Sequence, residues 1–444
     1  MNSAKDITRR KFVKTTALAG AGLGISMTAK SYSAIPGSND RLRFAVIGLN
    51  GRGKAHIGAI TKAKNAEVTY VCDVDQRTFP ETLKITRETY GTTPKTETDF
   101  RKLLEDKDID AVSIATPDHW HAPMTIMAVS AGKDVYVEKP CTHNPHEGEL
   151  LIEAQKKYGK VIQMGTQQRS APTSIQAIAD IHNGLIGETY FGRAWYANDR
   201  KSIGFGKKAD VPPGLDWDLW QGPAPRREYH DNWVHYNWHW FWNWGSGEIN
   251  NNGTHEIDIC RWALAVDFPV EVNSSGGRYA FKDDWQFYDT QVVNYQFPAG
   301  KMISWEGRSC NPFPELGWGR GSAIYGTNGT VLIDRNNYLA YDMTGKLIKE
   351  MKEPEESATT NTIGEGALDV YHMNNFLDAI RENQKLHSPI DAGHVTNLLC
   401  HLGNIAQKTG KNLKTDPENG KILNNEQAMK MWRREYEPGW EPKV

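Results

Sequence analysis

The sequence has few cysteines, almost no excess charge and no long apolar segment. Five cysteines among 444 residues are scattered and odd in number, so they show neither the paired spacing of a zinc site nor an obvious disulfide framework. A formal net charge of −2 gives no strong field toward nucleic acid or an anionic membrane. The sequence therefore predicts a protein with no nucleic-acid partner and no membrane anchor.

The first 34 residues resemble a twin-arginine export signal. Arg9 and Arg10 lie in "TRRKFVK", which precedes the glycine-rich apolar run "TTALAGAGLGISMTA" and small residues at 31–34. The run is too short and too rich in glycine to remain as a membrane anchor. A disordered basic terminus is the alternative interpretation. The signal interpretation predicts export of a folded protein by the twin-arginine translocase and a periplasmic location.

The remaining chain is long enough for two domains, and the first begins with a turn that suits a dinucleotide. In "RLRFAVIGLNGRGKAHIGAI" a strand from Leu42 to Ile47 leads through a tight turn into a helix. Such a turn lets the backbone approach a pyrophosphate at the positive end of the helix. The strict glycine fingerprint is broken only at its second position, by an asparagine that tolerates positive φ. We expect cofactor contacts from Gly48, Asn50, Gly51, Arg52 and Gly53.

Asp73 ends the next predicted strand, twenty positions beyond Gly53. A carboxylate there can accept hydrogen bonds from ribose hydroxyls and would repel a 2′-phosphate, which favours NAD over NADP. Nearby Arg77 could still serve a phosphate, and a solvated residue at the strand end is the alternative interpretation.

Helices and strands then alternate as far as residue 165, which predicts a doubly wound parallel Rossmann sheet over residues 41–165. Ligands bind at the carboxyl ends of such strands. Two predicted strand ends carry polar residues, and they add the candidate cofactor contacts Thr116, Pro117, His121, Glu138 and Lys139. Near a cationic nicotinamide, the Lys139 amine should have a lowered pKa, which suits proton transfer with a substrate hydroxyl. A surface lysine before a turn is the alternative.

Four motifs resemble the glucose–fructose oxidoreductase/inositol dehydrogenase (Gfo/Idh/MocA) family: "VIGLNGRG", "TPDHWH", "AGKDVYVEKP" and "GSGEINNNGTHEID". The resemblance covers nearly all of the chain from about residue 40. It implies an α/β protein in which a Rossmann domain is followed, over 166–444, by an α+β domain whose large open, mostly antiparallel sheet covers the nicotinamide. It also implies hydride transfer at a sugar or cyclitol carbinol.

The same resemblance assigns the catalytic residues. Lys139 matches the family's catalytic lysine and His255 its assisting histidine. Asn251 stands where the family usually carries Asp, and an amide can orient a hydroxyl but cannot accept a proton. Asp258, one turn after His255, is a candidate either to orient the imidazole or to cap the helix.

Seven of the 15 tryptophans fall between residues 217 and 244. Aromatic faces suit sugar rings, although about half of these side chains should simply be core. Tyr236, His239 and Arg169 are our further candidates for substrate contact, together with Asn251. The histidines in "EYHDNWVHYNWHW" lack an accompanying acidic or cysteine ligand set, so we predict no metal.

Alternating segments from about residue 270 to 342 predict the antiparallel strands of the open sheet, through which we expect a homo-oligomer. The leading functional prediction is a periplasmic, NAD-dependent oxidoreductase that acts on a sugar and retains its cofactor. One alternative is a redox-neutral enzyme that cleaves a glycoside after transient oxidation of a ring carbinol. A non-catalytic protein that binds NAD and a sugar is the second alternative.

Overall fold

The computed structural model describes residues 41–353 and 366–444. The predicted export signal, with Arg9 and Arg10, lies outside the described residues and stays a prediction. Leu42–Val444 forms one compact unit. No helix within the described ranges combines the length and the apolar character needed to cross a membrane.

The first half forms a six-stranded sheet in which every strand is parallel to its neighbours. The strand order is β3-β2-β1-β4-β5-β6, which confirms the predicted doubly wound fold. The strands are β1 (Leu42–Ile47), β2 (Ala66–Cys72), β3 (Lys95–Glu97), β4 (Ala111–Ile114), β5 (Asp134–Val137) and β6 (Ile162–Met164). The connecting helices are α2 (Arg52–Lys62), α3 (Phe79–Tyr90), α4 (Phe100–Glu105), α5 (Asp118–Ser130) and α6 (Pro145–Tyr158).

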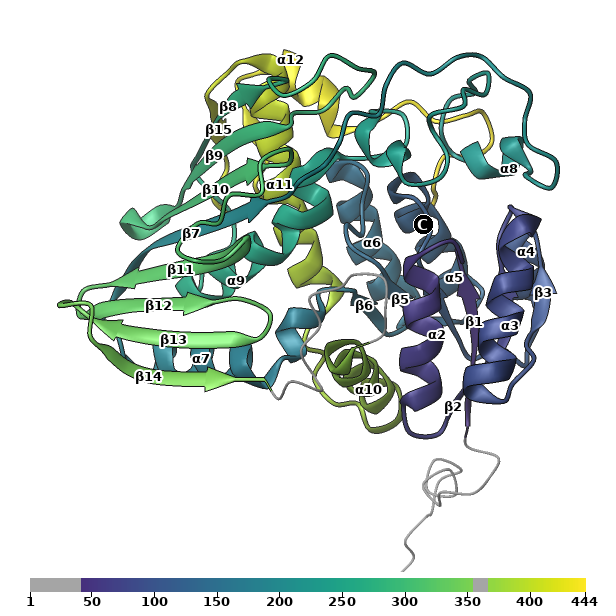
Figure 1. Ribbon diagram of the computed structural model, residues 1–444, viewed down its shortest axis with the longest axis horizontal. Coiled ribbons are helices and arrows are strands. Elements are labelled where there is room, and N and C mark those ends of the chain that lie inside the picture. The colour runs from purple at the N-terminus through teal and green to yellow at the C-terminus, as the bar shows by residue number, and fades with distance from the viewer. Residues whose placement is uncertain (1–40, 354–365) are drawn as a thin grey trace, which may run out of the picture. The chain divides into compact units, whose positions relative to one another are not determined.

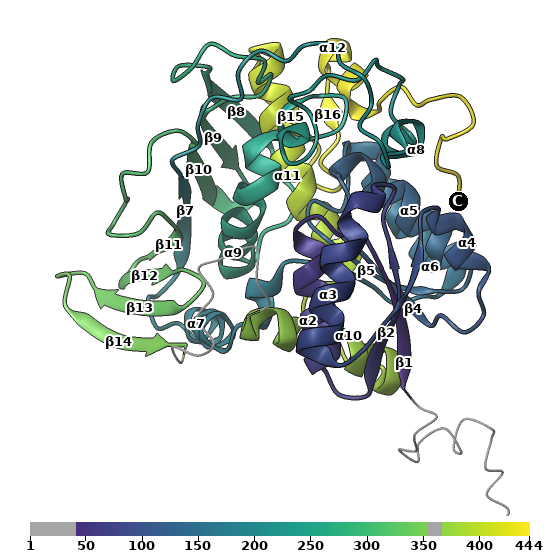
Figure 2. The ribbon, with the colours of Figure 1, turned by 45° about the vertical axis from the view of Figure 1, so that its right-hand side comes forward.

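Both faces of this sheet are covered, because successive side chains of a strand point to opposite faces. On β1, Phe44 and Val46 pack in one buried cluster with residues of α2 and of α10 (Ala367–Glu382). Ala45 and Ile47 pack in a second cluster, with residues of α4, α5 and α6. Figure 2 shows α2 and α10 near each other although about 300 residues separate them.

The second half builds a ten-stranded sheet in the order β14-β13-β12-β11-β7-β10-β9-β8-β15-β16. Its pairings are antiparallel except for β7 with β10, so the predicted mostly antiparallel sheet is confirmed. The strands are β7 (Thr189–Ala197), β8 (Glu271–Gly277), β9 (Thr290–Gln296), β10 (Met302–Arg308), β11 (Arg320–Gly326), β12 (Gly329–Ile333), β13 (Asn337–Asp342), β14 (Leu347–Lys352), β15 (Leu413–Thr415) and β16 (Ile422–Leu423).

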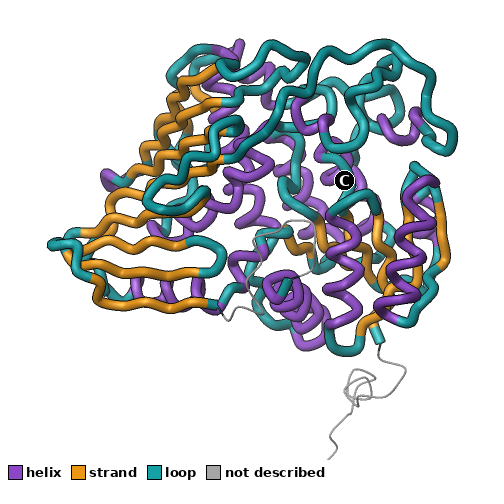
Figure 3. The backbone as a smooth tube through the Cα atoms, in the orientation of Figure 1, coloured by secondary structure: helices purple, strands orange, loops and turns teal. Residues whose placement is uncertain are grey.

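One face of this sheet packs against α7 (Pro172–His182), α9 (Thr254–Leu264) and α11 (Ile390–Thr409) (Figures 1 and 3). Every second residue of β9 and of β10 points toward these helices and is buried. Examples are Val293 and Tyr295 on β9 and Ile303 and Trp305 on β10. The homo-oligomer expected through the open sheet stays a prediction.

Segments of the predicted second range, 166–444, pack against the sheet and helices of the first range, 41–165. The Phe376 ring of α10 lies 6.3 Å from that of Phe44, and near the end of the chain the Trp440 ring lies 5.2 Å from that of Trp120. Segments from the far end of the sequence therefore pack against apolar faces of the first sheet and its helices.

Candidate active site

A cavity of about 970 Å³ lies at the carboxyl ends of the strands of the parallel sheet. Its lining also includes residues of β7, of the loop that leads into β11, of the turn between β12 and β13, of α10 and of the tryptophan-rich segment. Of the predicted site residues, the structure brings these to the cavity: Gly48, Asn50, Gly51, Arg52, Asp73, Thr116, Pro117, His121, Glu138, Lys139, Tyr236, His239, Asn251 and His255. Gly53 and Arg169 do not line it.

The turn from β1 into α2 packs closely against neighbouring protein backbone. Gly48 has φ of +90°, and a Cβ there would lie 2.5 Å from the Ala115 carbonyl oxygen. A Cβ on Gly53 would lie 1.8 Å from the Gly48 carbonyl oxygen, so Gly53 lets the helix pack on the turn. Helix α2 begins with no side-chain cap and no acidic residue in its first turn. Its first N–H groups therefore fit the pyrophosphate of a dinucleotide.

Asp73 is held in place at the edge of this cradle. Its Oδ2 accepts a hydrogen bond from the Leu49 N–H at 2.7 Å and its Oδ1 from the Asp75 N–H at 2.9 Å. Burial raises the pKa of Asp73. The Arg77 guanidinium is bound to Asp75, with Nη2 at 2.6 Å from Oδ2, and so is not left free for a phosphate.

Glu138 is the centre of a buried ion-pair network. Its Oε1 accepts hydrogen bonds from Arg52 Nε at 2.7 Å and Gln167 Nε2 at 2.8 Å, and lies 3.0 Å from His56 Nε2. Burial alone would raise the pKa of Glu138, but Arg52 and His56 hold it well below its usual range. Arg52 also pairs with Asp369 on α10. Glu138 and Arg52, which were both predicted as cofactor contacts, therefore have their charges balanced by ion pairs within the protein.

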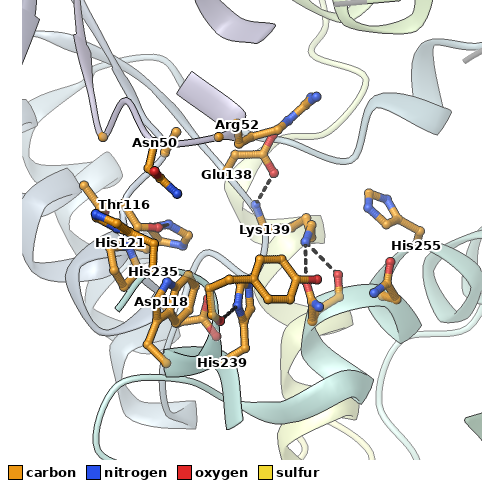
Figure 4. A pocket seen from close by; sticks show the side chains of 18 of the residues that line it. Asn50, Arg52, Thr116, Asp118, His121, Glu138, Lys139, His235, His239 and His255 are labelled. Atoms are coloured by element: carbon orange, nitrogen blue, oxygen red, sulfur yellow. Dashed lines mark hydrogen bonds and ion pairs between the residues drawn. The ribbon is translucent and has the colours of Figure 1, made fainter. Parts of the chain in front are cut away.

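Lys139 presents its amine to the cavity (Figure 4). Its Nζ donates to the Asn251 carbonyl oxygen at 2.6 Å and to Asn251 Oδ1 at 3.2 Å. Asn251 lies on a π-helical turn, Ile249–Gly253, that leads into α9. Burial lowers the pKa of Lys139, and the nearby Glu138 and Asp118 carboxyls partly oppose that shift.

His255 lies in the first turn of α9 and is 4% exposed. Its Nδ1 is buried and has no hydrogen-bond partner among the described residues. Burial, with added repulsion from Arg335, Arg320 and Lys139, lowers the pKa of His255 well below its usual range. The imidazole is therefore neutral near pH 7 and carries a nitrogen that a substrate hydroxyl could meet.

Thr116, Pro117 and His121 lie where β4 turns into α5. The Thr116 hydroxyl is buried and has no hydrogen-bond partner among the described residues. The His121 ring nitrogens lie 2.5 Å from the Pro140 carbonyl oxygen and 2.8 Å from that of Thr116, which ties two strand ends together. Asp118 was not predicted, although it stands within the "TPDHWH" motif that was. It accepts a hydrogen bond from the Ser246 hydroxyl, and burial raises its pKa to about 7.

Arg169 is a wrong prediction as a substrate contact. Its guanidinium pairs with Asp258 through two bonds, of 2.6 and 2.9 Å, away from the cavity. A buried guanidinium requires such a partner. Asp258 also accepts from the Thr396 hydroxyl, so it neither orients His255 nor caps α9.

The tryptophan-rich segment is divided between core and cavity. Trp220 and Trp238 line the cavity, and five of the seven tryptophans are buried in a cluster of their own: Trp217, Trp220, Trp233, Trp240 and Trp244. Tyr236 and His239 reach the cavity as predicted. The Tyr236 hydroxyl accepts from Arg200 Nη1 at 2.6 Å, and His239 Nδ1 lies 2.5 Å from the Tyr236 carbonyl oxygen.

Sequence reasoning also missed three cavity arginines, Arg200, Arg320 and Arg335. They come from the segment after β7, the start of β11 and the turn after β12. Only the pairing of distant strands brings them to one cavity, and no local motif marks them.

Two sequence models of one oxidoreductase family match this chain. The NAD-binding Rossmann fold of the family matches residues 42–166, and its C-terminal alpha/beta domain matches residues 191–313. The chain is 28% identical over 354 residues to a glycosyl hydrolase family 109 protein of Saccharopolyspora erythraea, covering 72% of each chain. It is 24% identical to an alpha-N-acetylgalactosaminidase of Tannerella forsythia, covering 86% of this chain and 90% of the other.

An inositol 2-dehydrogenase of Rubrobacter xylanophilus is 24% identical, with 67% of this chain and 72% of the relative covered. Among solved structures, a levoglucosan dehydrogenase in complex with NADH and levoglucosan has a TM-score of 0.65 and 20% identity, over 84% of this chain and 99% of that one. That likeness supports the fold. Since the two family models together match more than half of the chain, this protein belongs to the Gfo/Idh/MocA oxidoreductase family.

Proposed function

We propose that the protein is an NAD-dependent oxidoreductase acting on a CH–OH group of a carbohydrate. The observation that carries this proposal is that one cavity holds a dinucleotide cradle, the Lys139 amine and the neutral, unpartnered His255 imidazole. Gly48, Asn50, Gly51 and the start of α2 would hold the dinucleotide. NAD, when bound, supplies a hydride acceptor.

The side chains of this chain supply the proton chemistry. Burial lowers the pKa of the Lys139 amine, which favours exchange of a proton with a substrate hydroxyl. Asn251 fixes the amine through two hydrogen bonds and cannot itself take the proton. His255 offers a second acceptor, so Lys139 and His255 share the acid–base work.

We further propose that Asp73 selects NAD over NADP. Asp73→Ser should lower NAD affinity and narrow the gap to NADP, because the charged acceptor for the ribose hydroxyls is lost. Hydrogen bonds to a charged group predict a change of roughly ten- to a hundredfold. Calorimetric titration with both cofactors measures it, and unchanged NAD affinity would make Asp73 an ordinary strand-end carboxylate.

A redox-neutral glycosidase is the second candidate, and the glycosyl hydrolase family 109 relatives favour it. In that chemistry, hydride transfer from a ring carbinol to the cofactor would acidify the neighbouring C–H, and loss of that proton would expel the glycosidic oxygen. Water would then add to the resulting unsaturated ketone, and return of the hydride would restore the carbinol. The same cavity residues would serve both activities. The two activities can be distinguished by incubating the protein with the same glycosides and assaying the products. An oxidoreductase accumulates an oxidised sugar and NADH, whereas a redox-neutral glycosidase releases a free sugar with no net NADH.

The export motif supports a cofactor that stays bound, because soluble NADH is scarce outside the cytoplasm. Heat-denaturing the purified protein and assaying the supernatant for nicotinamide tests this point. One equivalent per chain supports a retained cofactor, and none would contradict it.

A periplasmic location by twin-arginine export is likewise our proposal, supported by "TRRKFVK" before a glycine-rich run. Replacing Arg9 and Arg10 together by Lys should leave the folded protein in the cytoplasm. Equal recovery of both forms from the periplasmic fraction would exclude this route.

A further inference from the structure

Four arginines line the cavity, and three of them have their charge matched by the protein. Arg52 pairs with Glu138 and Asp369, Arg200 with Glu248 at 2.5 Å, and Arg320 with Glu256 at 2.7 Å. Arg335 is different, because among the described residues it has no carboxylate within ion-pair distance and no hydrogen-bond acceptor.

The turn that carries Arg335 is fixed by its own hydrogen bonds. Asp334 Oδ1 accepts from the N–H groups of Asn336 at 2.7 Å and Asn337 at 2.6 Å, and the Asp334 carbonyl oxygen accepts from Gln168 Nε2 at 2.9 Å. The guanidinium is therefore presented from a braced turn between two paired strands.

Arg335 lies close enough to His255 and Lys139, the proposed acid–base residues, to affect their pKa values. Its charge is the one that repels a protonated His255 most strongly, and it acts on Lys139 as well. Burial, followed by repulsion from Arg320, lowers the pKa of Arg335 to about 9, which still leaves it charged near neutral pH. The Glu256 and Asp369 carboxylates act in the opposite direction, but they pair with Arg320 and Arg52 and not with Arg335. Two neighbouring acceptors, Asn336 Oδ1 and Gln168 Oε1, are buried and unpartnered among the described residues.

A half-buried cation without a counter-ion is costly unless a ligand supplies the missing charge. A guanidinium offers two parallel N–H donors that match the oxygens of a carboxylate, phosphate or sulfate. The orphan oxygens of Asn336 and Gln168 can accept from hydroxyl groups beside it. We propose that the substrate is an acidic carbohydrate whose anionic group binds Arg335. This inference rests on the proposed function and names its substrate class.

The test is calorimetric binding to the NAD-loaded protein of matched pairs of sugars that differ in their acidic group. The probes are glucuronate against glucose, galacturonate against galactose, and the 6-phosphates of both hexoses, which separate a carboxylate from a phosphate ester. At least one acidic probe should bind more tightly than its neutral partner by about 10- to 100-fold, and Arg335→Gln should abolish that preference. Arg335→Lys, which keeps the charge but not the two parallel N–H donors, should retain part of the preference for the acidic probe. Arg433→Gln removes a charge from an exposed residue outside the cavity and should retain all of it.

Three results would overturn the proposal. The first is that no acidic probe binds more tightly than its neutral partner, and the second is that such a preference survives in Arg335→Gln. The third is that Arg335→Gln weakens NAD binding as much as it weakens binding of the acidic probe, which would assign the guanidinium to the cofactor. Because the readout is binding, an acidic sugar that binds through Arg335 and does not reduce NAD would contradict the proposed function and leave this inference standing.

Discussion

Asp118 shows how strongly the cavity perturbs a single carboxyl group. Its pKa rises from 3.8 to about 7 because burial penalises the charged form. The folded protein therefore holds a proton that the unfolded chain releases between these pH values. The stability from this proton is fully present below the unfolded pKa and is lost as the pH rises through 7.

Asp118→Asn should consequently stabilise the protein increasingly as the pH rises. The uncharged amide keeps the shape and avoids burying a carboxylate, so the gain should be small near about pH 4 and reach a few kcal/mol near about pH 8. Urea denaturation at both pH values measures it. Asp218→Asn, at an exposed carboxylate, is the control. An equal gain from Asp118→Asn at both pH values would contradict the burial argument.

At the residue scale, the sequence predicted side chains that local motifs place at strand ends. Lys139, Asp73 and Thr116 all follow a buried strand and all line the cavity. Arg169 failed because nothing in the sequence reveals that Asp258, 89 residues away, binds its guanidinium. Arg335 was missed because only the strand pairing of the second sheet brings its turn to the cavity.

At the element scale, the junction of β1 with α2 depends on a close backbone approach. Gly53→Ala should push the helix from the turn, because the added Cβ would lie 1.8 Å from the Gly48 carbonyl oxygen. We expect a loss of stability of about 1–3 kcal/mol together with weaker NAD binding. Lys54→Ala, in the same helical turn, is the control. Melting and NAD titration that match wild type in Gly53→Ala would show that the junction tolerates a side chain.

The stretch "NNGTHEIDICRWAL" does not form one continuous helix. A π-helical turn, Ile249–Gly253, positions Asn251 before α9 begins at Thr254. The sequence carries no periodic signal for such a turn, which here serves the site.

For the whole molecule, the sequence predicted that a parallel sheet is followed along the chain by a mostly antiparallel sheet. It did not predict how distant segments pack together. Alternating strands and helices predict a parallel sheet, and period-two segments predict an antiparallel one. By contrast, α10 and Trp440 complete the covering of the first sheet and its helices through contacts across hundreds of residues. No local pattern encodes such contacts.

We propose that this cavity oxidises a carbohydrate carbinol with Lys139 as its proton-transfer group. The most direct measurement is rapid mixing of NAD-loaded wild type, Lys139→Met and His255→Ala with candidate sugars, following the dihydronicotinamide absorbance. Lys139→Met should retain fold and NAD but reduce the ring about 10²–10⁴-fold more slowly, and His255→Ala should lose less if it only assists. A Lys139→Met protein that reduces its bound NAD as fast as wild type would contradict the account.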